Sequence, residues 1–110
     1  MASTKDYLDY VLGQLSELKE LSYRPMMGEY VLYYQGKVVG GIYDNRILLK
    51  ATQSAVKLQE KNESSLPMAI PYEGAKKMIS ADIDDTDFTC ALIRSIARDL
   101  PEPKAKRVKK

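Results

Sequence analysis

Residue types that carry acid–base or metal chemistry are scarce in this sequence. It contains no histidine, which is the commonest general base and the commonest zinc ligand. Its one cysteine, Cys90, lies in a stretch with helical apolar spacing, where a thiol usually serves as a small buried apolar group. A Ser-His or Cys-His catalytic arrangement is therefore impossible within these residues. We predict no catalytic residues and no enzyme activity.

Four aspartates close together are the candidate for binding a cation. The cluster consists of Asp82, Asp84, Asp85 and Asp87. A calcium loop of the EF-hand type needs glycine at its sixth position and glutamate at its twelfth, and Asp87 and Ile93 stand there instead. We favour the interpretation that Asp84 or Asp85 caps a following helix, and we predict no metal and no cofactor. The alternative is a small-ligand or enzyme site of unknown type at these carboxylates.

The last ten residues form a basic tail with five cations against one acid, whereas the rest of the chain has a small acidic excess. Five cations can contact about five phosphates, so DNA binding through the tail would be weak, non-specific and salt-dependent. The alternative is a terminus that only improves solubility. We expect one domain over residues 1–100 and a basic disordered tail over 101–110. The candidate nucleic-acid-binding residues are Lys104, Lys106, Arg107, Lys109 and Lys110.

Length and composition indicate a small soluble protein. A chain of 110 residues suffices for one two-layer core. No stretch approaches the roughly 20 apolar residues of a membrane span, and the first ten residues do not resemble a signal peptide. One cysteine excludes an internal disulfide and fits a reducing compartment. We therefore predict a cytoplasmic location and no membrane partner.

The stretch from residue 23 to 51 predicts three consecutive antiparallel strands. Gln35-Gly36 and Asp44-Asn45 each separate runs rich in Val, Ile, Leu and Tyr, which is typical of two-residue hairpin turns. Regular pairing across both turns sorts the side chains onto two faces. The uncharged face, which we expect in the core, contains Val31, Tyr33, Val38, Gly40, Ile42, Ile47, Leu49 and Ala51.

The other face of this predicted sheet mixes tyrosines and aliphatic residues with cations. It is either an ordinary solvated surface or an interface for a protein partner or a second copy of the chain, because Tyr and Arg are enriched at interfaces. The candidate partner-binding residues on it are Tyr30, Leu32, Tyr34, Tyr43, Arg46 and Leu48.

Apolar spacing and capping residues place the remaining elements. We expect helices over residues 4–21, 53–61 and from about 85 to 100, an irregular extended segment over 66–72 and a strand over 76–83. The resulting order is α-β-β-β-α-β-β-α. This predicts a two-layer α+β fold whose antiparallel sheet is covered by helices on one face.

One segment resembles a known family. The resemblance rests on the motif Arg24, Pro25, Met26 and Gly28. It continues through Gly36-Lys37-Val38 and Asp44-Asn45-Arg46. These residues resemble the N-terminal domain of the TfoX/Sxy competence regulators of bacteria, whose fold is similar to that of type III secretion chaperones.

This resemblance implies a non-enzymatic regulator that acts by protein–protein contacts, with transcription machinery as a possible partner. The founding members assist transcription of DNA-uptake genes together with the cyclic-AMP receptor protein. They also carry a second, C-terminal domain, which this sequence does not contain. We therefore expect no helix-hairpin-helix grip and no sequence-specific reading of DNA.

Overall fold

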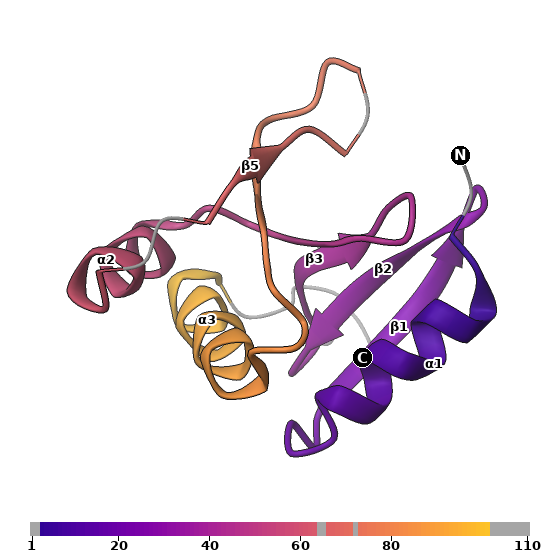
Figure 1. Cartoon of the computed structure of the whole chain (residues 1–110), viewed down its shortest axis with the longest axis horizontal. Coiled ribbons are helices and arrows are strands. Elements are labelled where there is room, and N and C mark those ends of the chain that lie inside the picture. The colour runs from indigo at the N-terminus through magenta and orange to yellow at the C-terminus, as the bar shows by residue number, and fades with distance from the viewer. Residues whose placement is uncertain (1–2, 64–65, 72, 102–110) are drawn as a thin grey trace, which may run out of the picture.

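The computed structural model describes residues 3–63, 66–71 and 73–101 (Figure 1). Its strands form one six-stranded antiparallel sheet in the order β1-β2-β3-β4-β6-β5. This confirms the predicted α+β fold class. The elements are α1 (Lys5–Gln14), β1 (Leu21–Met26), β2 (Glu29–Tyr34), β3 (Lys37–Ile42), β4 (Ile47–Leu49), α2 (Gln53–Lys61), β5 (Met68–Ala69), β6 (Met78–Ser80) and α3 (Thr86–Asp99).

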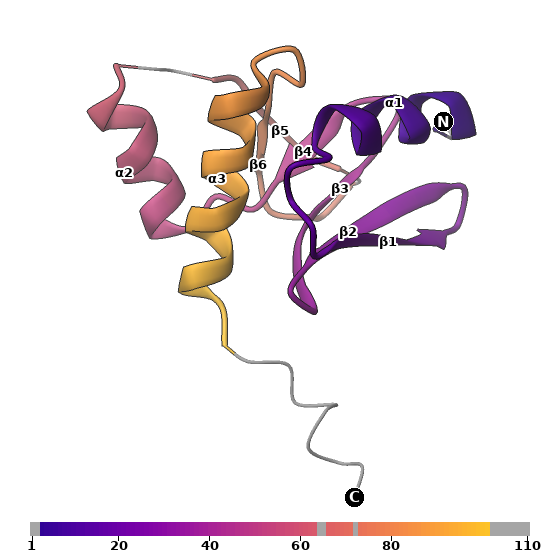
Figure 2. The ribbon, with the colours of Figure 1, turned by 90° about the horizontal axis from the view of Figure 1, so that it is seen from below.

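The core lies between the sheet and the helices α1 and α3. Buried side chains of both helices pack with buried side chains of β2, β3, β4 and β6 in one cluster. Helix α2 lies on the outer side of α3 (Figure 2). No helix in the described parts of the chain is both long and apolar enough to cross a membrane.

Residues that tolerate positive φ make the tight turns of the sheet. Gln35-Gly36 and Asp44-Asn45 have φ values from 53° to 79°, which confirms the two predicted turns. Met27-Gly28, with φ values of 52° and 85°, makes a third turn of the same length. It joins β2 to β1, a strand that the sequence analysis did not predict.

The first helix is shorter than predicted, and this leaves room for β1. Helix α1 ends at Gln14, one residue after Gly13, whereas the apolar spacing suggested a helix to residue 21. The chain continues in tight turns, with the Leu18 amide bonded to the Leu15 carbonyl and the Leu21 amide to the Leu18 carbonyl. Leu15 and Leu18 are buried in this non-helical segment, so they extend the apolar pattern without extending the helix.

A β-bulge in β3 changes which side chains of the hairpin reach the core. Tyr33 pairs with Val38 as predicted, but Leu32 pairs with Gly40, so Val39 is an extra residue. The predicted core face is therefore wrong for the first hairpin: Tyr30 and Leu32 are on the helix side, and Val31 is on the opposite side. Ile42, Ile47 and Leu49 are in the core as predicted.

The later helices follow the sequence prediction closely. Helix α2 occupies the predicted residues, and its cap Thr52 accepts a hydrogen bond from the Ala55 amide. Asp85 caps α3 by accepting from the Phe88 amide. Strand β6 is shorter than expected, because only three residues pair with β4 or β5.

Candidate functional site

The six residues predicted to bind a partner do not share one exposed face. Leu32 and Leu48 are fully buried, with 0% exposure, so they cannot contact a partner. Tyr30 and Tyr34 pack against the core on the helix side. Tyr43 is half-buried and Arg46 is exposed near the turn between β3 and β4. The β-bulge explains the positions of Tyr30 and Leu32, because it reverses the side of the sheet to which they belong.

The aspartate cluster has structural partners. Asp85 caps α3, and the Asp82 carboxylate accepts from the Asp84 amide at 3.0 Å. The Asp84 carboxylate accepts from the hydroxyl of Tyr10 at 2.5 Å, which raises the pKa of Tyr10. Within residues 3–63, 66–71 and 73–101, no three or more Cys, Asp or Glu side chains could together hold a metal ion. The tail cations Lys104, Lys106, Arg107, Lys109 and Lys110 lie outside the described residues.

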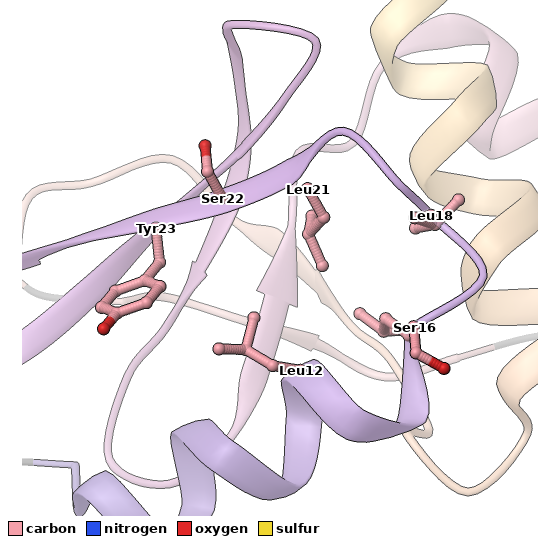
Figure 3. Close-up of a pocket in the computed structure, with 7 residues that line it drawn as sticks. Leu12, Ser16, Leu18, Leu21, Ser22 and Tyr23 are labelled. Atoms are coloured by element: carbon pink, nitrogen blue, oxygen red, sulfur yellow. The ribbon is translucent and has the colours of Figure 1, made fainter.

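An apolar pocket of about 350 Å³ lies between the end of α1 and the edge strand β1 (Figure 3). Leu21 and Tyr23 of β1 point towards α1, whereas Ser22 between them points away (Figure 3). Among the residues that the structure describes, no charged side chain lines this space. We call it the α1–β1 groove, and its lining residues are Leu12, Leu15, Ser16, Leu18, Leu21, Ser22 and Tyr23.

Strand β1 presents one unpaired edge beside this groove. It is the first strand of the sheet, and five of its six residues are exposed. The Gln35 amide donates to the Glu20 carbonyl, so Glu20 and Gln35 are a hydrogen-bonded pair. Hydrogen-bonded and non-hydrogen-bonded pairs alternate along antiparallel strands, so this bond determines which residues of β1 bond to β2. Ser22, Arg24 and Met26 then bond to β2, and the N–H and C=O of Tyr23 face outward.

The neighbours of Tyr23 limit what this edge can donate. The Leu21 amide already donates to the Leu18 carbonyl at 3.2 Å. Pro25 has no N–H. Its backbone nitrogen faces outward, as that of Tyr23 does, and an edge strand tolerates proline at such a position. Between Leu21 and Pro25 the edge therefore offers three outward carbonyls and one free donor, the Tyr23 amide.

Aromatic contacts support the position of Tyr23. Its ring meets the ring of Tyr30 edge-on, with the centroids 5.8 Å apart. Tyr23 remains 38% exposed, and Met26 and Met27 are exposed at the end of the strand and in the turn that follows it. Among the predicted partner-binding residues, Tyr30 thus supports the ring of Tyr23 from the neighbouring strand, and Tyr34 lies opposite Leu21.

This arrangement can bind an extended segment. An added strand would bond to the Tyr23 backbone, and its side chains on the helix side would enter the apolar groove. The groove could not be predicted from the sequence, because the apolar spacing of residues 15–21 indicated a helix. Pro25 and the Met27-Gly28 pair were the available signals, since together they indicate an edge strand followed by a tight turn.

The model of the TfoX N-terminal domain family matches residues 13–88. This chain belongs to the TfoX N-terminal domain family. A relative from Spirochaeta aurantia, an uncharacterized 12.7 kDa protein in the trpE 5′ region, is 35% identical over 111 residues, covering 99% of this chain and 93% of the relative.

The family match includes the whole sheet and most of the groove. All groove residues except Leu12 fall within the matched range. The motif Arg24, Pro25, Met26 and Gly28, which carried the resemblance in the sequence, occupies the second half of β1 and the turn after it. The TfoX N-terminal motif of this chain is therefore part of the exposed edge strand.

Proposed function

We propose that this protein is a non-enzymatic, cytoplasmic bacterial regulator that acts in competence-like transcription regulation by binding a segment of a partner protein in the α1–β1 groove. Membership of the TfoX N-terminal domain family supports the regulatory role. The observation that carries the binding mode is an exposed edge strand directly beside an apolar pocket. Long unpaired edges tend to recruit a further strand, so such an edge is either protected or used.

The incoming segment adds antiparallel to β1, centred on Tyr23. The N–H and C=O of Tyr23 then form one bonded pair with a single residue of the partner. That residue shares the face of Tyr23 and directs its side chain to the helix side, as does the residue opposite Leu21. The partner segment therefore has apolar side chains two positions apart and carries no charge at either.

A partner of different sequence suits this edge better than a second copy of β1. Two β1 strands paired around Tyr23 would make only the two Tyr23 bonds. Pro25 has no N–H for the carbonyl of Leu21, and the Leu21 amide is already bonded to Leu18. A partner strand without proline supplies its own donors to the carbonyls of Leu21 and Pro25.

Selection from a random peptide library displayed on phage tests the binding mode. We expect enrichment of segments with apolar residues two apart, and synthetic copies of them should bind with micromolar dissociation constants in calorimetry, as is common for peptide grooves. Tyr23→Pro removes the outward N–H, whereas Tyr23→Ala removes the same ring and keeps the N–H. Tyr23→Pro should weaken binding at least fivefold more than Tyr23→Ala. Equal effects of the two variants, or no enriched segment, would contradict strand addition.

Transcript profiling of the host tests the regulatory role separately. A strain lacking the gene should regain its normal transcript pattern with the wild-type protein but not with Tyr23→Pro at equal abundance. If both versions restore the pattern equally, the groove is not the regulatory surface. If deletion changes no transcripts, the transcription role itself is wrong, even where peptides bind.

A further inference from the structure

A second cavity lies on the opposite face of the sheet from the helices. It measures about 500 Å³ and lies between β3, the end of β4 and the segment that leads into β6. Leu49 and Ile79 point into the core, so the adjacent lining residues Lys50 and Met78 belong to the other face by alternation. Val38, which is 36% exposed, also lines the cavity. This site is therefore separate from the α1–β1 groove.

Three lysines line this cavity, and no acid does so among the residues that the structure describes. Lys50 follows β4, and Lys76 and Lys77 precede β6, so the lysines that line the cavity come from two distant parts of the sequence. The rest of the chain before the tail has an acidic excess. Three like charges around one depression repel one another, and an anion between them removes this repulsion.

The walls of the cavity are largely apolar. Val38 and Met78 contribute from the strands, and Pro71 and Ala75 contribute from the connection between β5 and β6. The side chain of Tyr43 adds an aromatic ring with a polar end. Apolar walls with a few polar groups are the usual composition of small-molecule sites, and 500 Å³ is within their common size range of roughly 300–1,000 Å³.

We propose that this cavity binds a small organic anion, in which a carboxylate, sulfonate or phosphate group is attached to an apolar or aromatic body. The lysines take the anionic group and the strand side chains take the body. This cavity is distinct from the aspartate cluster, which the sequence suggested as an alternative ligand site. The cluster would bind a cation, whereas this cavity would bind an anion. The inference is independent of peptide binding in the groove.

The fluorescent probe 1-anilinonaphthalene-8-sulfonate has both parts of this chemistry. We expect saturable binding of one probe per chain, weakened by sodium chloride because the lysines act through charge. Replacing Lys50, Lys76 and Lys77 with glutamine should weaken binding at least tenfold. The matched control replaces Lys19, Lys57 and Lys61, which are exposed elsewhere, and should change binding less than twofold.

Two further variants separate this cavity from the groove. Ala75→Trp fills the cavity without changing charge and should abolish probe binding, while Ser16→Trp fills the groove and should leave it unchanged. The proposal is overturned if the two lysine triples behave alike, if Ser16→Trp rather than Ala75→Trp removes binding, or if no saturable binding is found. Competition by inorganic pyrophosphate alone, at the affinity of the probe, would overturn the role of the apolar walls.

Discussion

Three glycines of this chain differ in how much space a side chain would have at their positions. A Cβ on Gly40 would lie 2.2 Å from the Leu48 carbonyl oxygen and 2.9 Å from the Leu49 Cα, both backbone atoms that cannot move aside. A Cβ on Gly41 would lie 2.6 Å from the Tyr30 carbonyl oxygen. Gly13 near the end of α1 has no atom within 4 Å of that position. The two strand glycines therefore permit close strand contact, and Gly13 only weakens a helix.

Alanine substitutions should separate these roles. Gly40→Ala should destabilise the fold by about 3 kcal/mol or more, because the added methyl overlaps backbone atoms. Gly13→Ala should stabilise it by roughly 0.5–1 kcal/mol through higher helix propensity. Urea unfolding measured by circular dichroism gives both values. A neutral Gly40→Ala would show that β3 and β4 are not packed as closely as described.

Asp99 contributes a pH-dependent part of the stability. Its carboxylate accepts from the Ser54 hydroxyl at 2.6 Å and from the Ser54 amide at 2.8 Å, and these bonds lower the pKa of Asp99. A lowered pKa in the folded state means that the stabilisation is present at neutral pH and is lost as the pH falls through that pKa.

Removing the Asp99 carboxylate should therefore lower the free energy of unfolding only in the pH range where this carboxylate is charged. Asp99→Ala should lower the free energy of unfolding by roughly 0.5–1 kcal/mol at pH 7, because an exposed anion at a helix N-terminus has an effect of this size. The difference from wild type should shrink as the pH falls below 4. Glu60→Ala controls for loss of an exposed carboxylate, and an undiminished Asp99→Ala effect in acid would contradict the account.

At the scale of elements, local signals predicted some parts and missed others. Thr52 and Asp85 mark the starts of α2 and α3 because capping depends on neighbouring residues alone. The Asp44-Asn45 turn is local in the same way. The apolar spacing of Leu15 and Leu18 is ambiguous, since side chains can be buried from a turn as well as from a helix. The end of α1 and the existence of β1 therefore could not be read from it.

The sides of the first hairpin depend on contacts between elements. Only the pairing of β3 with both β2 and β4 places Val39 as an extra residue, and regular alternation cannot anticipate it. The groove shares this origin, since α1 and β1 meet only in three dimensions. The sequence could predict the fold class and the family, but not which tyrosines lie beside a site.

The edge strand β1 is protected by Pro25. Replacing Pro25 with valine adds one outward N–H, so a β1–β1 pair around Tyr23 would have four bonds available instead of two. We expect Pro25→Val to raise self-association at least tenfold in analytical ultracentrifugation. Ser22→Val adds the same apolar side chain at a position whose N–H already bonds to β2. Equal association of the two variants would attribute the effect to apolar surface rather than to strand pairing.

At the scale of the molecule, α1 is attached at both ends to parts of the chain distant in sequence. The Ser3 amide donates to the Gly28 carbonyl, and the Ser3 hydroxyl accepts from the Asn45 amide, both at 3.0 Å. Near the other end, Tyr10 bonds to Asp84, and the Gln14 side chain donates to the Ile83 carbonyl. These contacts fix the wall of the groove that Leu12 supplies.

Because α1 forms one wall of the groove, loosening it should affect binding more than folding. Tyr10→Phe removes the bond to Asp84 from an exposed position, so we expect little change in urea unfolding but a two- to fivefold loss of affinity for groove-binding peptides. Tyr33→Phe, on the opposite side of the sheet, is the control and should change neither.

The raised pKa of Tyr10 gives a second test of the same contact. The bond stabilises the fold below the ordinary pKa of tyrosine and is lost as the pH rises through the folded-state value. Peptide affinity of the wild type should therefore fall towards that of Tyr10→Phe in alkali, while Tyr10→Phe itself changes less. A parallel decline of both proteins would show that α1 is held in place without this bond.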